Sequence, residues 1–338
     1  MALYAAIDLH STNGVLSIID GDDRVLFERR LPNDLAVVLQ SLQPYRDDIV
    51  AIAVESTYNW YWLVDGLIDH GYSVRLVNTA AVPQYDGLKH GNDHTDARHL
   101  AHLLRLGILP TGYVYPRQAR ALRDLQRRRF LLVHQSTALM LSVQSAWSRR
   151  TGHGLPANDF RRLTTKDVQA AIIDPLERAA IFAQLDAWRA IQAQVEQVET
   201  WVLQHQRGSQ ALRSLRSIPG IGAILGSTIA LETGDIGRFG SVGDYASYCR
   251  MVDSKRLSNG KRKGRGNTKC GNRYLCWAFI EAANFALRHS AEIRRWYERK
   301  KAKKLRVVAL KAVAHKLARA SYYLMRDGGE FDVKRAFG

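Results

Sequence analysis

Residues 2–31 have the sequence ALYAAIDLHSTNGVLSIIDGDDRVLFERRL, and this stretch decides the fold of the amino-terminal part. Residues 2–7 are a short apolar run that ends at Asp8, which predicts a strand. The segments GVLSIID and RVLFERRL flank the turn GDD, and this pattern predicts a β-hairpin. We therefore expect three strands in this stretch.

Helices and strands alternate further along the chain. The segment DIVAIAVE predicts a buried strand that ends at Glu55, and YSVRLVN predicts another strand. Helical spacing occupies residues 34–43, the segment TYNWYWLVDGLIDHG, and residues 93–107. A hairpin followed by alternating helices and strands predicts an α/β mixed sheet covered by helices. This order matches a ribonuclease-H-like sheet, which we place in residues 1–112, and no P-loop or GxGxxG motif competes with it.

From about residue 116 to 206 the pattern becomes purely helical. Leu125, Leu132, Leu139 and Ala146 recur every seven residues. A second run places apolar residues at alternating three- and four-residue steps, namely Leu185, Trp188, Ile191, Val195, Val198 and Val202. This periodicity predicts a coiled-coil arm over residues 113–208. The arm is either an intramolecular helical hairpin or a dimerisation element, and dimerisation is favoured because a two-helix hairpin has little core of its own.

Residues 209–338 are basic and predicted to be mainly α-helical. The segment LRSLRSIPGIGAILGSTIA places a PGIG turn between two helical segments. This predicts a helix-hairpin-helix-like element, in which Gly220 and Gly222 leave backbone N–H groups open to a phosphate. A tight connection without DNA contact is the alternative. The basic stretch at residues 294–306 is either a solvated helix face or a surface that follows a nucleic-acid strand.

Charge is divided unequally along the 338 residues, whose formal net charge is +17. Residues 1–112 carry 8 basic and 14 acidic side chains, and the remainder carries 41 and 18. A basic chain is expected to bind a polyanion, and an acidic pocket held against phosphates requires a divalent cation. Three cysteines without CxxC spacing indicate neither a zinc site nor a disulfide framework. The absence of a signal peptide pattern and of a long apolar stretch predicts a cytoplasmic protein with no membrane partner.

Four carboxylates, Asp8, Glu55, Asp93 and Asp96, form the candidate metal site. Asp8 and Glu55 end predicted strands, and Asp93 and Asp96 share a helix face that can point toward the same sheet edge. Two Mg²⁺ ions would relieve the repulsion among them and bind a scissile phosphate, with Mn²⁺ as the alternative ion. Singly, Asp93 could be a helix N-cap and Asp8 could begin a turn. Zinc is disfavoured because hard oxygen ligands prefer magnesium or manganese, although histidines lie nearby at His90, His94, His99 and His102.

A second candidate cluster is the segment CRMVDSKRLSNGKRKGRGNTKCGNRYL. Nine basic residues and one acidic residue lie between Arg250 and Arg273, and the glycines allow close approach to phosphates. Ser258 lies in this charge, which could stabilise its alkoxide as a nucleophile; a structural serine in a basic turn is the other interpretation. The residues expected to bind nucleic acid here are Arg256, Lys261, Arg262, Lys263, Arg265, Lys269 and Arg273.

These residues together resemble the DEDD-type transposases of the insertion-sequence 110 family, which are bridge-RNA-guided recombinases with a RuvC-like domain. The resemblance covers nearly the whole chain. Its amino-terminal motifs are AIDLH, AVESTYNW, SVRLVN and DHTDARHLA. Its carboxy-terminal motifs are SIPGIG, ALETGDIGRF, the serine region around Ser258, and GNTKCGNRYL.

The resemblance implies DNA strand exchange by magnesium-dependent transesterification. The four carboxylates would hold Mg²⁺, and Ser258 would attack a DNA phosphate to form a covalent phosphoserine intermediate. The family pattern further implies a composite active site shared between protomers of a dimer or tetramer. It also implies a structured non-coding bridge RNA that pairs with donor and target double-stranded DNA, in the nucleoid of a bacterium.

The sequence departs from the family pattern in three places. Gly91 and Asn92 stand where Lys-Thr is usual, and Tyr58 stands where Gly is usual. Residues 250–253 replace a Gly-Leu-x-Pro, so Ser254 is the alternative nucleophile. Two other functions remain open: a RuvC-like structure-specific nuclease, such as a junction resolvase, that hydrolyses phosphodiesters with no covalent intermediate, and a non-enzymatic RNA–DNA scaffold.

Overall fold

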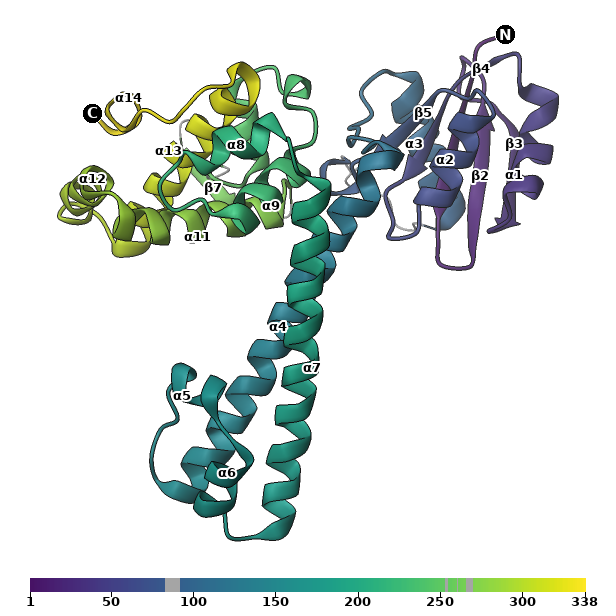
Figure 1. Ribbon diagram of the computed structural model, residues 1–338. Helices are drawn as coiled ribbons and strands as arrows, with labels where there is room; N and C mark the ends of the chain where they lie inside the picture. Colours follow the sequence, from purple (N-terminus) through teal and green to yellow (C-terminus); the bar gives the residue numbers. More distant parts are fainter. Residues whose placement is uncertain (83–91, 253–254, 260, 266–269) are drawn as a thin grey trace. The chain divides into compact units, whose positions relative to one another are not determined.

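The computed structural model describes residues 1–82, 92–252, 255–259, 261–265 and 270–338, and it contains two compact units (Figure 1). The first unit comprises Met1–Arg117 and Ser254–Cys270, and the second comprises Gln118–Asp253 and Gly271–Gly338. No helix within these described ranges combines the length and apolarity needed to cross a membrane.

The first unit is built on a five-stranded mixed sheet with the order β3-β2-β1-β4-β5 (Figure 1). The strands are β1 (Leu3–Leu9), β2 (Asn13–Ile19), β3 (Val25–Pro32), β4 (Ile49–Glu55) and β5 (Val74–Val77). β1, β2 and β3 pair antiparallel, whereas β4 is parallel to both β1 and β5. This arrangement confirms the predicted mixed sheet, including the hairpin that residues 2–31 predicted.

Helices cover both faces of this sheet. On one face, α1 (Leu35–Leu42) and α2 (Tyr61–Asp69) pack on odd-numbered residues of β1, such as Ile7. On the other face, α3 (Asp93–Arg105) packs on even-numbered residues, such as Ala6. Successive side chains of a strand point to opposite faces. Odd-numbered residues of β1 therefore face α1 and α2, and even-numbered residues face α3.

The second unit begins with two long helices, α4 (Arg117–Thr151) and α7 (Pro175–His205). Arg129 pairs with Glu199 and Ser136 bonds to Gln192, so the two helices run antiparallel. The connection between them holds two short helices, α5 (Ala157–Arg162) and α6 (Thr165–Ala171). Of the predicted apolar seam on α7, the buried members are Leu185, Val195, Val198 and Val202.

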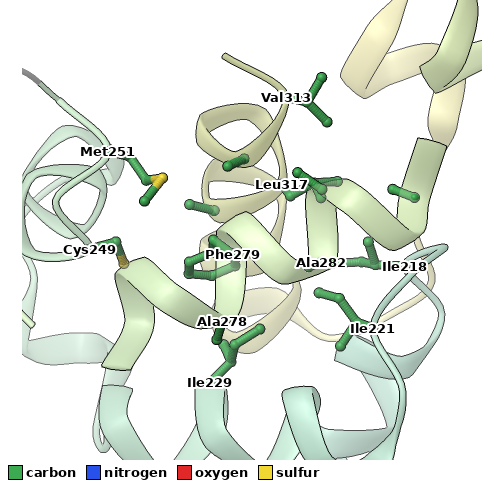
Figure 2. Packing of buried hydrophobic residues seen from close by; sticks show 14 of the residues in the cluster. Ile218, Ile221, Ile229, Cys249, Met251, Ala278, Phe279, Ala282, Val313 and Leu317 are labelled. Atoms are coloured by element: carbon green, nitrogen blue, oxygen red, sulfur yellow. The ribbon is translucent and has the colours of Figure 1, made fainter. Parts of the chain in front are cut away.

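The remaining helices form one core. They are α8 (Gln210–Arg216), α9 (Ala223–Thr233), α10 (Val242–Tyr248), α11 (Arg273–His289), α12 (Ala291–Lys301), α13 (Arg306–Asp327) and α14 (Val333–Phe337). Figure 2 shows Phe279 of α11 in the centre of this core, with Leu317 of α13 and Cys249 nearby. Fully buried alanines on α11, among them Ala278 and Ala282, let neighbouring segments approach closely. This confirms the predicted, mainly helical carboxy-terminal region.

The basic segment departs from this helical pattern. Its described residues form a hairpin of β6 (Lys255–Ser258) and β7 (Lys261–Arg265), paired antiparallel with Ser258 opposite Lys261. The hairpin was not predicted from the sequence. It groups with the amino-terminal sheet in the first unit and not with the helical core.

Candidate active site

Two of the predicted carboxylates come from neighbouring parallel strands. Asp8 lies near the carboxyl end of β1, and Glu55 is the last residue of β4. Ala6 and Ala53, two residues before each of them, belong to the core cluster that packs against α3. Since residues two apart in a strand share a face, Asp8 and Glu55 both point to the α3 side of the sheet.

The other two carboxylates lie in the first turn of α3, which covers that face. The N-cap of the helix is Asn92, whose Oδ1 accepts from Thr95 N at 2.9 Å, while Thr95 Oγ1 accepts from Asn92 N at 2.8 Å. This capping box satisfies the helix start. The alternative in which Asp93 is the N-cap is therefore wrong, and both Asp93 and Asp96 are available to the site.

The site holds more negative charge than its surroundings stabilise. Burial, a hydrogen bond with Asp8, and the charges of Asp8 and Asp96 raise the pKa of Glu55 to about 8. Loss of hydration and the charges of Asp8 and Asp93 raise the pKa of Asp96. Asp8 itself is buried, with 4% of its surface exposed. Like charges brought together disfavour ionisation, so these shifts identify a place where a cation is needed.

Asp93 is the exception, because it has a cationic neighbour. Arg30 of β3 places Nη2 2.5 Å from Asp93 Oδ2, and this hydrogen bond lowers the pKa of Asp93. The arginine lies at the rim of the cluster, where it is partly exposed. It therefore neutralises one side of the site, and among the described residues no arginine or lysine pairs with Asp8 or Glu55 in this way.

His10 is a further member of the site that the sequence analysis missed. Its Nε2 lies 3.4 Å from Asp8 Oδ2 and 3.2 Å from Asp93 Oδ2. This nitrogen is buried and makes no hydrogen bond of ordinary geometry within the described residues. The Asp-x-His spacing was the available indication, because it places His10 on the same face as Asp8.

This donor set fits a divalent cation. One ligand atom each from Asp8, His10 and Asp93 lie within 4.8 Å of one another, a separation that a single ion can span. Glu55 and Asp96 add oxygen donors beside them, and a dication would stabilise their ionised forms. Carboxylate oxygens suit magnesium or manganese, and an imidazole nitrogen is tolerated better by manganese than by magnesium.

Two of the other histidines near the aspartates are engaged in ion pairs that tie α3 to the β2–β3 hairpin. His94 Nδ1 lies 2.9 Å from Glu28 Oε1, and His102 Nδ1 lies 2.9 Å from Asp23 Oδ2. Arg98 and Arg105 reinforce the same two carboxylates. His90 lies outside the described residues, and His94 and His102 point their Nδ1 atoms at these two carboxylates.

The basic hairpin places Ser258 at the end of β6, just before the turn. The next residue, Asn259, is exposed and has a positive φ of 50°, a conformation that favours tight turns. The backbone of Ser258 belongs to the same compact unit as the four carboxylates. Ser254 and Lys269 lie outside the described residues.

The predicted nucleic-acid ligands of this segment divide between the two units. Arg256 lies in β6, and Lys261, Arg262, Lys263 and Arg265 lie in β7. Lys261 is exposed. Arg273 instead starts α11 in the helical unit, where its exposed guanidinium lies over the Tyr274 ring at 5.0 Å.

The PGIG turn connects α8 to α9 and lines a surface groove of about 690 Å³ together with Arg216, Phe285 and His289. Gly220 has a φ of +91°, and a Cβ there would lie 2.5 Å from Ala286 N. Packing against α11 therefore accounts for this glycine. Gly222 is the N-cap of α9, and a Cβ at that position meets nothing within 4 Å.

Two family models match this chain. One, described as transposase and belonging to the DEDD transposases of IS110, matches residues 5–147 and so includes all four carboxylates. The other, described as the transposase IS116/IS110/IS902 family, matches residues 212–298, which include the PGIG turn and the basic hairpin.

Curated proteins show the same similarity. A "Probable family 20 transposase" of Pseudomonas aeruginosa is 24% identical, over 81% of this chain and 83% of its own length. An "Insertion element IS116 uncharacterized 44.8 kDa protein" of Streptomyces clavuligerus is 23% identical, over 96% of this chain and 95% of its own. A "Transposase for insertion sequence element IS1328" of Yersinia enterocolitica is 25% identical, over 41% of this chain and 42% of its own.

Proposed function

The chain belongs to the IS116/IS110/IS902 family of transposases, and from that premise we propose that it cuts and joins DNA strands by transesterification at the carboxylate cluster. The observation that carries the proposal is the convergence of Asp8, Glu55, Asp93 and Asp96 on one face of the sheet, with the pKa of Glu55 raised to about 8. Such a cluster accepts divalent cations, and Mg²⁺ or Mn²⁺ would supply Lewis-acid stabilisation of the scissile phosphate.

The four carboxylates would hold the metal ions, and His10 would complete the ligand set between Asp8 and Asp93. Asp93 is held by Arg30, so one ligand is oriented before any ion binds. Asp8 is fixed by its buried position in β1. These constraints support a preformed site, which reduces the entropy lost when a DNA phosphate is positioned.

We further propose Ser258 as the nucleophile, with Ser254 as the alternative. Ser258 Oγ would give up its proton and form an O–P bond to a DNA phosphate, while the bond to the leaving DNA oxygen breaks and that oxygen takes up a proton. A hydroxyl of the second strand would then attack the phosphoserine and release Ser258. The number of phosphodiester bonds is conserved, so no nucleotide cofactor is required. The many basic residues around Ser258 support this assignment, because positive charge stabilises a serine alkoxide.

The partners proposed are donor and target double-stranded DNA and a structured bridge RNA that pairs with both. The excess of basic residues after residue 112 supports nucleic-acid binding. The proposed functional division keeps the carboxylate domain at 1–112, an arm at 113–208, and a domain at 209–338 that carries the serine. The long α4 and α7 helices would mediate assembly into a dimer or tetramer, because their packing against each other leaves apolar residues such as Leu141 and Trp201 exposed. Each active site would then be shared between protomers.

The test is covalent trapping. The purified protein is incubated with its co-purified RNA, Mg²⁺ and labelled duplexes from the sequence flanking its gene, and denaturing gels are examined for a protein–DNA adduct. We expect an adduct with the wild type and none with Ser258→Ala or Asp96→Asn. An adduct that persists in Ser258→Ala and disappears in Ser254→Ala would move the nucleophile. Cleavage without any adduct would instead indicate a hydrolytic, resolvase-like nuclease.

A further inference from the structure

The connection between α12 and α13 exposes apolar side chains within a basic surface. Leu305, Val307 and Val308 are 78%, 75% and 51% exposed. Four exposed lysines precede them and one exposed arginine lies among them in residues 300–308, which we call the basic-apolar tip; these cations are Lys300, Lys301, Lys303, Lys304 and Arg306. Apolar side chains this exposed, and gathered in one turn, indicate a surface that is covered by a partner.

Helix stability does not explain the residues of this tip. Leu305 is the N-cap of α13, and its side chain caps no backbone N–H. Serine, threonine, aspartate and asparagine are preferred at an N-cap because their oxygens accept those N–H groups. The first turn of α13 also contains no acidic residue, and it begins with Arg306 at the positive end of the helix dipole. Leu305 therefore neither packs in the core nor caps the helix, so its role lies outside the fold.

The charges of the tip favour an anionic partner. In the described part of the chain, Glu298 pairs with Lys301 at 3.2 Å, and no acidic side chain pairs with Lys303, Lys304 or Arg306. These three cations adjoin Leu305 in the sequence, at the start of α13, where no side chain caps the backbone N–H groups. A suitable partner must offer several anionic groups around an apolar recess.

Duplex DNA offers both features at its minor groove. Proteins that bend DNA insert an apolar side chain between two base pairs from that groove and contact the adjacent phosphates with Arg and Lys. We propose that the basic-apolar tip inserts Leu305 into the minor groove of duplex DNA, with Lys303, Lys304 and Arg306 on the flanking phosphates, and bends the duplex. This inference rests on the proposed function and adds how the DNA is shaped. Because pyrimidine–purine steps unstack most easily, insertion is favoured at TA or CA/TG steps.

The experiment measures bending and binding separately. A short duplex with one central TA step and a fluorophore at each end is titrated with the wild-type protein, and energy transfer reports the approach of the ends. Leu305→Ser provides a better N-cap, so we expect a melting temperature at or above that of the wild type. The duplex is still bound by this variant, but the rise in energy transfer is lost. Leu305→Met, which keeps an apolar wedge, retains bending.

Two controls separate the insertion of Leu305 from the phosphate contacts of the neighbouring cations. In Lys303→Gln/Lys304→Gln the slope of log affinity against log salt becomes shallower by about 2, one unit for each lost phosphate contact, while the bound duplex remains bent. Ile173→Ser removes an apolar side chain that is 88% exposed at the far end of the α4–α7 arm, and it leaves both readouts unchanged.

The inference is overturned if Leu305→Ser bends the duplex as the wild type does, or if the wild type binds duplex without bending it. In either case the transposase function stands, because cleavage and adduct formation are measured independently. It is also overturned if Leu305→Ser loses binding to phosphatidylserine–phosphatidylcholine vesicles, or loses self-association, while bending is unchanged. Failure of the wild type to bind any duplex would reject the inference and the proposed function together.

Discussion

Asp8 lies near the carboxyl end of β1 and Glu55 ends the neighbouring parallel strand β4, and their carboxyl groups share a hydrogen bond. Burial and the charge of Asp8 raise the pKa of Glu55 to about 8, so near neutral pH the metal-free site retains a proton on Glu55. A divalent cation bound at the site would favour the ionised form and displace this proton. Protonation and metal binding at this pair are therefore coupled, and both can be measured without any DNA substrate.

We first predict that the metal-free protein loses stability as the pH rises through the window set by Glu55. Its reference pKa is 4.5 and its folded-state pKa is about 8, so between these values the folded chain binds a proton that the unfolded chain has released. The stabilisation is complete below pH 4.5 and is lost as the pH rises through 8. Its size is at most about 1.4 kcal/mol for each pH unit in the window. Urea unfolding with EDTA at a series of pH values measures it.

Glu55→Gln is the matched variant for this prediction, because it keeps the shape of the side chain and removes the titration. Its stability should vary less with pH than that of the wild type. Asp22→Asn, at an exposed carboxylate in the β2–β3 turn, is the control and should retain the wild-type dependence. If the stability of the wild type rises between pH 4.5 and 8 relative to that of Glu55→Gln, the assignment of this pKa to Glu55 is contradicted.

We next predict that His10 contributes directly to metal binding. Its Nε2 lies within 3.4 Å of Asp8 and 3.2 Å of Asp93, so an ion shared by these carboxylates would lie beside the imidazole. His10→Ala should weaken Mn²⁺ binding by about tenfold or more, in the range found when groups that orient a metal site are removed. Titration calorimetry gives the affinity, and pulsed EPR of bound Mn²⁺ detects the coupling to a ligand nitrogen.

His102→Ala is the control for that prediction, because His102 pairs with Asp23 on the hairpin and is separate from the Asp8–His10–Asp93 group. Its nitrogen coupling and affinity should match the wild type. An unchanged nitrogen signal in His10→Ala would show that the imidazole does not ligate the ion.

The sequence predicted most of the sheet because the apolar runs and the turn residues between them indicated the same strands. The apolar runs that end at Asp8 and Glu55 became β1 and β4, and their parity placed both carboxylates on the face that α3 covers. The Asp93–Asp96 spacing was sufficient to place that pair in one helical turn. Each of these inferences depends on local geometry, which a single sequence carries well.

What the sequence did not reveal depends on contacts between distant segments. The basic segment pairs with itself as β6 and β7, although lysine and glycine are poor strand formers. His10 follows β1 in a polar stretch, and its role emerges only because α3 brings Asp93 beside it. Similarly, the sequence gives no sign that Gly220 packs against α11, and the prediction that its turn contacts DNA stays a prediction.

A third prediction concerns the ion pair between the half-buried Arg127 of α4 and the buried Glu232 of α9. Arg127 Nε and Nη2 lie 2.6 and 2.7 Å from the two carboxylate oxygens of Glu232, which is only 2% exposed. Arg127→Met would leave that carboxylate unpaired, at a cost of about 3–5 kcal/mol in unfolding free energy. Denaturant unfolding followed by circular dichroism measures the loss.

The double variant Arg127→Met/Glu232→Gln distinguishes this mechanism from simple loss of packing. Glutamine can still bond to Asn272, whose Nδ2 lies 2.7 Å from Glu232 Oε2, and it carries no charge that needs compensation. The double variant should therefore be more stable than Arg127→Met alone. If it is equally unstable or less stable, the loss comes from the stacking of Arg127 on Tyr274, at 4.7 Å, and not from the unpaired carboxylate.

The last prediction separates the two glycines of the PGIG turn. At Gly220, with φ +91°, a Cβ would lie 2.5 and 2.6 Å from backbone atoms of Ala286 and Ala282, which cannot rotate away. Gly220→Ala should therefore cost about 2–6 kcal/mol, the sum of a strained backbone and overpacking. At Gly222 there is room for a side chain, and aspartate is a better N-cap than glycine.

Gly222→Asp should thus be at least as stable as the wild type, yet it places a carboxylate in the groove beside Arg216, where a phosphate would bind. If the start of α9 contacts DNA, duplex affinity should fall about tenfold, which corresponds to about 1.4 kcal/mol. Gly222→Asn, a comparable cap without charge, should bind nearly as the wild type does. Equal affinities for the aspartate and asparagine variants would mean that the turn only connects α8 to α9, and that the DNA surface of the helical unit lies elsewhere.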